Sequence, residues 1–200
     1  MSDVAATHVT IEPEPPELQE RNLWVATRLL VSSTIFLFVP FVFAYVYLAA
    51  LDTAAMWRPP GVQAPIGWGI AVLACAVVSA GLVAWARAEL ASKRSSTSRL
   101  LLGLGLVAGI AGVVVQVLEF WHIGFGPKDG GFASVFVGWS LMYALVLLFT
   151  MIWLETILVS AIRNGFGSPG SGRSELDGIV FFLVFYAGLG ALSFMFLYLL

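Results

Sequence analysis

Five long apolar runs, separated by short polar connectors, are the feature that most constrains the fold of this chain. A helix needs about 20 apolar residues to cross roughly 30 Å of hydrocarbon, and each run reaches that length. The runs cover residues 23–51, 66–86, 100–121, 132–162 and 179–200. Because no connector is long enough for a separate domain, the sequence predicts an all-α integral membrane bundle of five transmembrane helices over residues 21–200.

Composition supports this fold class. Of the 200 residues, 60% are hydrophobic and only 11% are charged, which is too little charge to cover the surface of a soluble domain of this length. Residues 1–20 differ, because they carry four glutamates among three prolines and no hydrophobic periodicity. We interpret them as an acidic tail that is mostly disordered, with helix toward its end. No basic block predicts nucleic acid binding.

The distribution of lysine and arginine predicts the orientation of the bundle. Eight of the ten basic residues fall on the side shared by the N-terminus and the second and fourth connectors. Only Arg58 and Lys128 fall on the other side. Since basic residues are enriched in cytoplasmic loops, we expect the N-terminus inside and the C-terminus outside.

Residue counts argue against a redox or metal centre in the chain. Cys75 is the only cysteine, so an intrachain disulfide and a paired-cysteine metal site are both excluded. The two histidines, His8 and His122, are too few for a histidine-rich metal or haem site. The glycine-rich stretch 124–131 lacks the ending of a phosphate-binding loop, and we interpret it as a tight outer turn. We therefore expect no catalytic, cofactor-binding or metal-binding residue here.

Three polar residues share a helix face at the end of the third run. Gln116, Glu119 and His122 are spaced three apart, so they are placed to hydrogen-bond to one another or to a neighbouring helix. Ionisable groups at membrane depth are costly, and each raises a functional question. We interpret Glu119 as an interfacial carboxylate that stays ionised close to water. The alternative is a proton-linked carboxylate, or one that organises the helix interface.

Glu155 is the other acidic residue within an apolar run, about two turns before Arg163. We interpret it as an interfacial anchor near the cytoplasmic end, and the alternative is a group that collects protons.

Small residues predict where helices pack closely. Gly105 and Gly109 form a GxxxG pattern, with Ala108 and Gly112 one register along, and Gly188 and Ala191 lie in the last run. Such patterns are common in apolar helices, so they indicate a bundle and say nothing about function.

One block of the sequence joins a polar helix end to an aromatic helix entry. Residues 116–122, Gln-Val-Leu-Glu-Phe-Trp-His, are followed by the glycine turn and by Gly-Phe-Ala-Ser-Val-Phe at 131–136. This block resembles subunit III of the haem–copper cytochrome c oxidases, a family that carries a Gln-x-x-Glu-aromatic helix end, a loop, and a Tyr-Gly-Ser-x-Phe entry into the next helix. The resemblance implies the short bacterial form with five helices, a multi-pass subunit of the bacterial plasma (inner) membrane.

The sequence also departs from that family. Thr34 stands where the family has a membrane-embedded glutamate, and residues 140–146 lack the two histidines of its Thr-Gly-Phe-His-Gly-x-His motif. The resemblance implies a non-catalytic subunit that supports oxidase subunit I (and II) and binds phospholipid, with haem and copper only in the partner subunits. Because most of the polar set is missing, the scaffold role carries over better than a proton-related one.

Two alternatives stay open at this point. One is a related small subunit associated with nitric oxide reductases. The other is a free-standing small membrane transport component, against which the scarcity of polar residues argues.

Overall fold

The computed structural model describes residues 15–52, 56–166 and 173–200, and it is built from helices. The bounds of the elements are α1 Pro16–Ala50, α2 Ile66–Ala91, α3 Ser95–His122, α4 Gly131–Arg163, α5 Arg173–Phe194 and η1 Met195–Leu199. Five helices are long and apolar enough to cross a membrane, and η1 continues the fifth of them. The prediction of an all-α bundle with five candidate membrane spans is therefore confirmed.

Several helices extend beyond their apolar runs. Helix α1 begins at Pro16, so the last residues of the predicted acidic tail are helical, while residues 1–14 lie outside the described part. Helix α2 continues through Arg87 and Glu89, and α3 begins ahead of Arg99. An apolar run measures the hydrocarbon layer, whereas the backbone hydrogen bonds of a helix continue into the charged headgroup layer.

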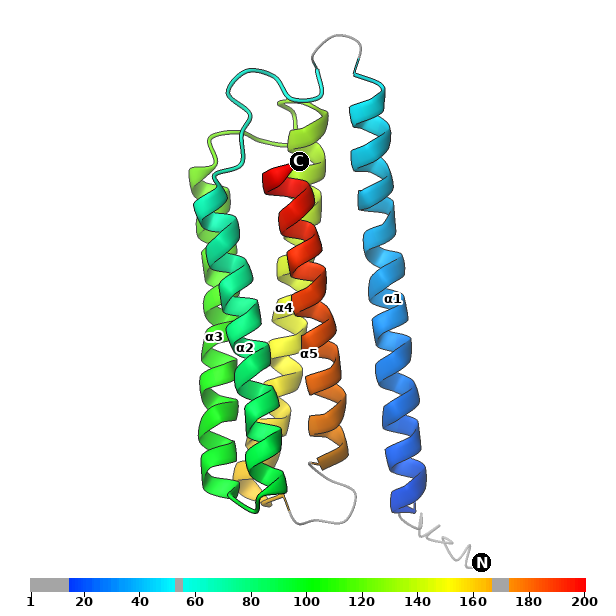
Figure 1. The fold of residues 1–200 in the computed structure, drawn as a ribbon, viewed down its shortest axis with the longest axis vertical. Helices are drawn as coiled ribbons and strands as arrows, with labels where there is room; N and C mark the ends of the chain where they lie inside the picture. Colours follow the sequence, from blue (N-terminus) through cyan, green and yellow to red (C-terminus); the bar gives the residue numbers. More distant parts are fainter. Residues whose placement is uncertain (1–14, 53–55, 167–172) are drawn as a thin grey trace, which may run out of the picture.

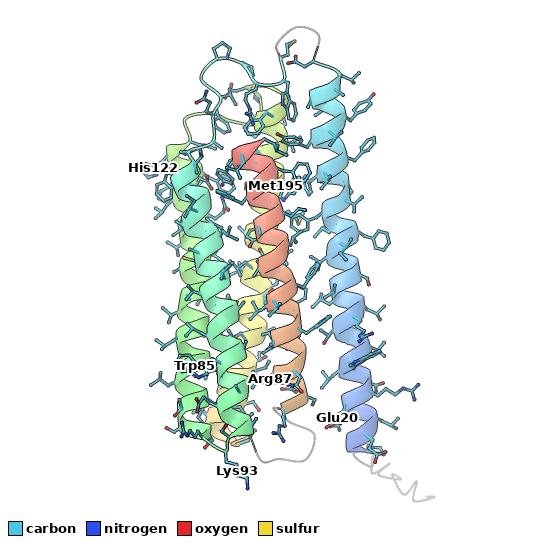
Figure 2. The ribbon with its side chains drawn as sticks, in the orientation of Figure 1. Glu20, Trp85, Arg87, Lys93, His122 and Met195 are labelled. Carbon is cyan, nitrogen blue, oxygen red and sulfur yellow. The ribbon has the colours of Figure 1, made fainter. Side chains whose placement is uncertain are left out.

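The helices run side by side along one axis, so the bundle has two ends (Figure 1). Helix α1 packs against α4 and α5, and α2 lies between α3 and α5 and packs on both. Figure 2 places Glu20, Arg87 and Lys93 at one end, which we call the inner end. His122 and Met195 lie at the opposite end, which we call the outer end. The start of α1 and the end of η1 thus lie at opposite ends, as an odd number of spans requires.

The glycine face of α3 lies in close helix contacts, as the GxxxG pattern predicted. Gly105 lies against α2, where a Cβ atom would come within 2.7 Å of Val83 Cγ2. The Ser79 hydroxyl donates a 2.8 Å hydrogen bond to the Gly105 carbonyl across the same interface. Gly112 lies between Cys75 of α2 and Leu147 of α4. These small residues let the backbones of α2 and α3 approach each other.

The small residues of α5 behave differently from the prediction. Gly188 and Ala191 are exposed on the outside of the bundle, and a Cβ atom at Gly188 would meet no atom within 4 Å. Gly190 is the buried glycine, and its Cα lies against the Tyr143 hydroxyl. The sequence pattern marked the wrong face because small residues occur on both sides of this helix.

The stretch between α3 and α4 forms the predicted tight turn. Gly124 and Gly130 have φ angles of +71° and +132°, which favour glycine. Asp129 Oδ2 accepts a 2.6 Å hydrogen bond from the Gly126 N–H, which closes the turn. The N–H groups of Gly131 and Phe132 donate to the carbonyls of Met56 and Trp57, so the turn is tied to the loop between α1 and α2.

Candidate functional site

A fully buried carboxyl group lies at the outer end of the bundle. Glu119 has no exposed surface, and it accepts hydrogen bonds from Gln116 Nε2 at 2.5 Å and from the Tyr198 hydroxyl at 2.7 Å. We call these three residues the Glu119 cluster. Neither ion pair found among the described residues involves Glu119, so two neutral donors satisfy its carboxyl. A buried carboxyl without such donors would be strongly destabilising.

Two elements bring the cluster together. Gln116 and Glu119 lie three residues apart on α3, which places their side chains on one face. Tyr198 comes from η1, a π-helical turn that follows α5 directly. Because a π turn adds a residue to each hydrogen-bonded loop, it shifts the side chains beyond it around the helix axis. We infer that this shift lets Tyr198 reach Glu119.

Gly69 of α2 makes room for the Tyr198 ring. A Cβ atom at this position would lie 2.7 Å from two ring carbons, closer than van der Waals contact allows. On its other side the ring meets Phe136 edge to face, with the centroids 5.5 Å apart. The cluster therefore joins α2, α3, α4 and η1 at one point. Neither Tyr198 nor Gly69 was among the residues singled out from the sequence.

The structure brings together two of the three residues predicted to share this face. His122 does not join Gln116 and Glu119, because its Nδ1 lies 2.6 Å from the Leu118 carbonyl of its own helix. The His122 ring is exposed and stacks on Trp68 of α2 at a centroid distance of 5.5 Å. The expectation that Glu119 lies close to water is wrong for the described bundle, since the side chain is completely enclosed.

Glu155 lies far from the cluster. It is exposed on α4, eight residues before the helix ends at Arg163, so it belongs to the inner half of the bundle. Trp153, two residues earlier, lies against Gly178, next to the Asp177 that pairs with Arg87. Glu155 is thus close to the level of the charged inner end, and its interpretation as an interfacial anchor stays a prediction.

A second polar group lies in the interior between α4 and α5. Trp139 Nε1 donates a 2.8 Å hydrogen bond to Ser193 Oγ, and the Tyr186 hydroxyl donates to the Tyr143 carbonyl. The rings of Tyr143 and Tyr186 stack with their centroids 4.4 Å apart. These contacts fix the register of α5 against α4.

The inner end holds a pocket with charged residues in its wall, of about 390 Å³, between α1 and α5. Glu20, Arg28, Arg173 and Asp177 line it. The Arg28 guanidinium lies over the Trp24 ring, 3.4 Å from its centroid, and Asp177 pairs with Arg87 of α2. This pocket lies at the depth where lipid headgroups meet a membrane protein.

The described residues contain no group of three or more His, Cys, Asp and Glu side chains that is arranged to hold a metal ion. What the Glu119 cluster offers instead is a hydrogen-bonded link between helices. No protein-family model and no curated protein sequence matches the chain. Fold and site thus define a multi-pass helical membrane protein with a buried carboxyl at one end.

Proposed function

We propose that this chain is a non-catalytic, subunit III-like component of a respiratory haem–copper oxidase in a bacterial plasma membrane. In this role it binds oxidase subunit I (and II) and phospholipid within the membrane. The haem and copper belong to the partner subunits. The chain supports the catalytic subunit by packing against it.

The observation that carries the proposal is the block from Gln116 to Phe136. Its sequence resembles the Gln-x-x-Glu helix end, loop and aromatic helix entry of the subunit III family. Its residues also act together in this chain: Glu119 is held by Gln116, and Ser134 Oγ donates to the Pro127 carbonyl within the turn. Phe132 and Phe136 are fully buried at the start of α4. A block with this many joint packing roles is a better basis for kinship than scattered identities.

The Glu119 cluster suits a scaffold role. A buried carboxyl held by two neutral donors ties the end of α3 to the end of the chain. Helix ends fixed in this way present a defined surface to a neighbouring subunit. On this proposal Glu119 organises the outer end and does not carry protons, because it lies opposite the inner end from which an oxidase draws them.

The interior gives little support to the transport alternative. Inside the described bundle the buried polar residues are few, and the buried threonines of α1 and α4 bond to their own helices, as Thr34 does to the Leu30 carbonyl and Thr150 to the Val146 carbonyl. A substrate pathway needs a continuous polar lining near the middle of the membrane.

Affinity purification of the tagged protein from its native membrane tests the proposal. We expect haem-containing subunits to co-purify in a fixed ratio, with oxygen reduction by the purified complex. Nitric oxide reduction without oxygen reduction would favour the nitric-oxide-reductase alternative. Purification of the chain by itself, with no haem protein attached under several mild detergents, would contradict the proposal.

A further inference from the structure

A small cavity with several polar side chains in its wall lies in the outer half of the bundle, next to the Glu119 cluster. Its volume is about 20 Å³. The polar side chains that line it are Gln116, Ser140, Tyr143, Ser193 and Tyr198. A cavity needs roughly 10–15 Å³ to hold one water molecule, so this one has room for one and not for a larger ligand.

One of the groups that line the cavity, the Tyr143 hydroxyl, lacks a hydrogen-bond partner in the described part of the chain. Tyr143 is 4% exposed, and its hydroxyl has no hydrogen-bond partner among the described residues. Leaving such a hydroxyl unpaired in a membrane interior is costly, because neither lipid nor the apolar side chains can bond it. Buried polar groups in proteins that lack a protein partner are commonly bonded to an ordered water molecule.

The cavity also offers the other partners that a bound water needs. The Ser193 hydroxyl accepts from Trp139 Nε1 and donates to the Leu189 carbonyl, which leaves one of its two lone pairs free to accept again. Ser140 places a second hydroxyl on the same wall. A water in the cavity would thus find two to three polar partners, the number typical of buried waters.

Gly190 preserves this space. Its Cα lies against the Tyr143 hydroxyl, where a side chain of any size would displace the phenol. Gly69, which also lines the cavity, accommodates the ring of Tyr198. Two glycines on two different helices therefore make room for the two tyrosine side chains that line the cavity.

We propose that this cavity is a binding site for a single structural water, which bridges the Tyr143 hydroxyl to the hydroxyls of Ser140 and Ser193. The water joins α4, which carries Tyr143 and Ser140, to α5, which carries Ser193. This inference concerns the chain itself and does not depend on the oxidase proposal.

The sign of one stability change tests the site. In the full-length purified protein, Tyr143→Phe removes the hydroxyl and keeps the ring that stacks on Tyr186. If a water satisfies the hydroxyl, the variant loses hydrogen bonds, and its Tm should fall by about 2–4 °C. If the hydroxyl is unpaired, its removal relieves a penalty, so an unchanged or raised Tm would overturn the proposal. Tyr47→Phe, at an exposed tyrosine of α1, is the matched control and should not shift the Tm.

A double-mutant cycle and a structure complete the test. A shared water couples Tyr143→Phe to Ser140→Ala, so the double variant should lose less stability than the sum of the two single variants. Additive losses would contradict a shared water. A high-resolution structure of the unmodified protein should show one density peak within hydrogen-bond distance of Tyr143 Oη and a serine Oγ. Tyr143 Oη bonded directly to a protein acceptor, with no such peak, would also overturn the proposal.

Discussion

At the scale of single residues, the Glu119 carboxyl is hydrogen-bonded by two protein donors in place of water. Its place near the end of an apolar run suggested contact with the headgroup layer, yet the side chain is fully enclosed. The enclosure comes from Tyr198, which is 79 residues away in sequence. A hydrogen bond to a buried carboxyl replaces hydration that the group has lost. Removing either the carboxyl or its donors should therefore lower the free energy of unfolding.

Two substitutions at Glu119 separate shape from charge. Glu119→Gln keeps the size and one acceptor oxygen, so we expect near-normal stability and assembly. Glu119→Ala leaves Gln116 and the Tyr198 hydroxyl without their partner and should cost about 1–3 kcal/mol. Thermal unfolding and the amount of co-purifying partner, measured for both variants, check this. A Gln variant that stays assembled yet loses oxidase activity would show that the charge itself is required, against the structural role assigned here.

Part of this site could be predicted from the sequence. The spacing of Gln116 and Glu119 on one helix is a local relation, and helical periodicity alone places the two side chains together. Tyr198 and Gly69 could not be found in this way. Their contacts depend on the π-helical turn at Met195–Leu199 and on how α2 packs against it. Neither the turn nor this packing can be predicted from the pattern of apolar residues.

At the scale of helices, hydrophobicity predicted where the membrane spans lie, but it did not predict the residues at which the helices begin and end. Charged residues at the level of the headgroups lie inside the helices, as Arg87 and Glu89 do in α2 and Arg99 does in α3. Such charges do not interrupt the backbone hydrogen bonds of a helix. Glycine patterns were right for α3, where Gly105 contacts Val83, and wrong for α5, where Gly188 faces outward. Which face of a helix packs is decided by its neighbours.

The two glycines provide a matched pair for measuring this packing. Gly105→Ala should destabilise by about 1–3 kcal/mol, because the new methyl group meets the fully buried, β-branched Val83 at 2.7 Å. Gly188→Ala meets nothing within 4 Å and gains helix propensity, so it should be neutral or slightly stabilising. Thermal unfolding of both variants is the measurement. Equal effects at the two sites would contradict the packing described for α3.

At the scale of the whole molecule, the described helices place α3 between the connector that holds Lys93 and the connector that holds Lys128. The excess of basic residues predicts that Lys93 faces the cytoplasm and Lys128 the outside. Single cysteines at these positions, introduced in a Cys75→Ala background, should react with a membrane-impermeant reagent from opposite sides. Labelling of both from one side would show that α3 does not cross the membrane.

The proposed scaffold role implies where the proposed complex keeps the haem. His122 is the one histidine in the described part, and it is exposed and stacked on Trp68, so the described residues offer no histidine pair for haem iron. The purified complex, separated into this chain and the remaining subunits, should show the whole haem spectrum in the remaining subunits and none with the isolated chain. A stoichiometric haem spectrum from the isolated chain, or an intact complex without haem, would contradict the proposal that this protein is a non-catalytic oxidase subunit.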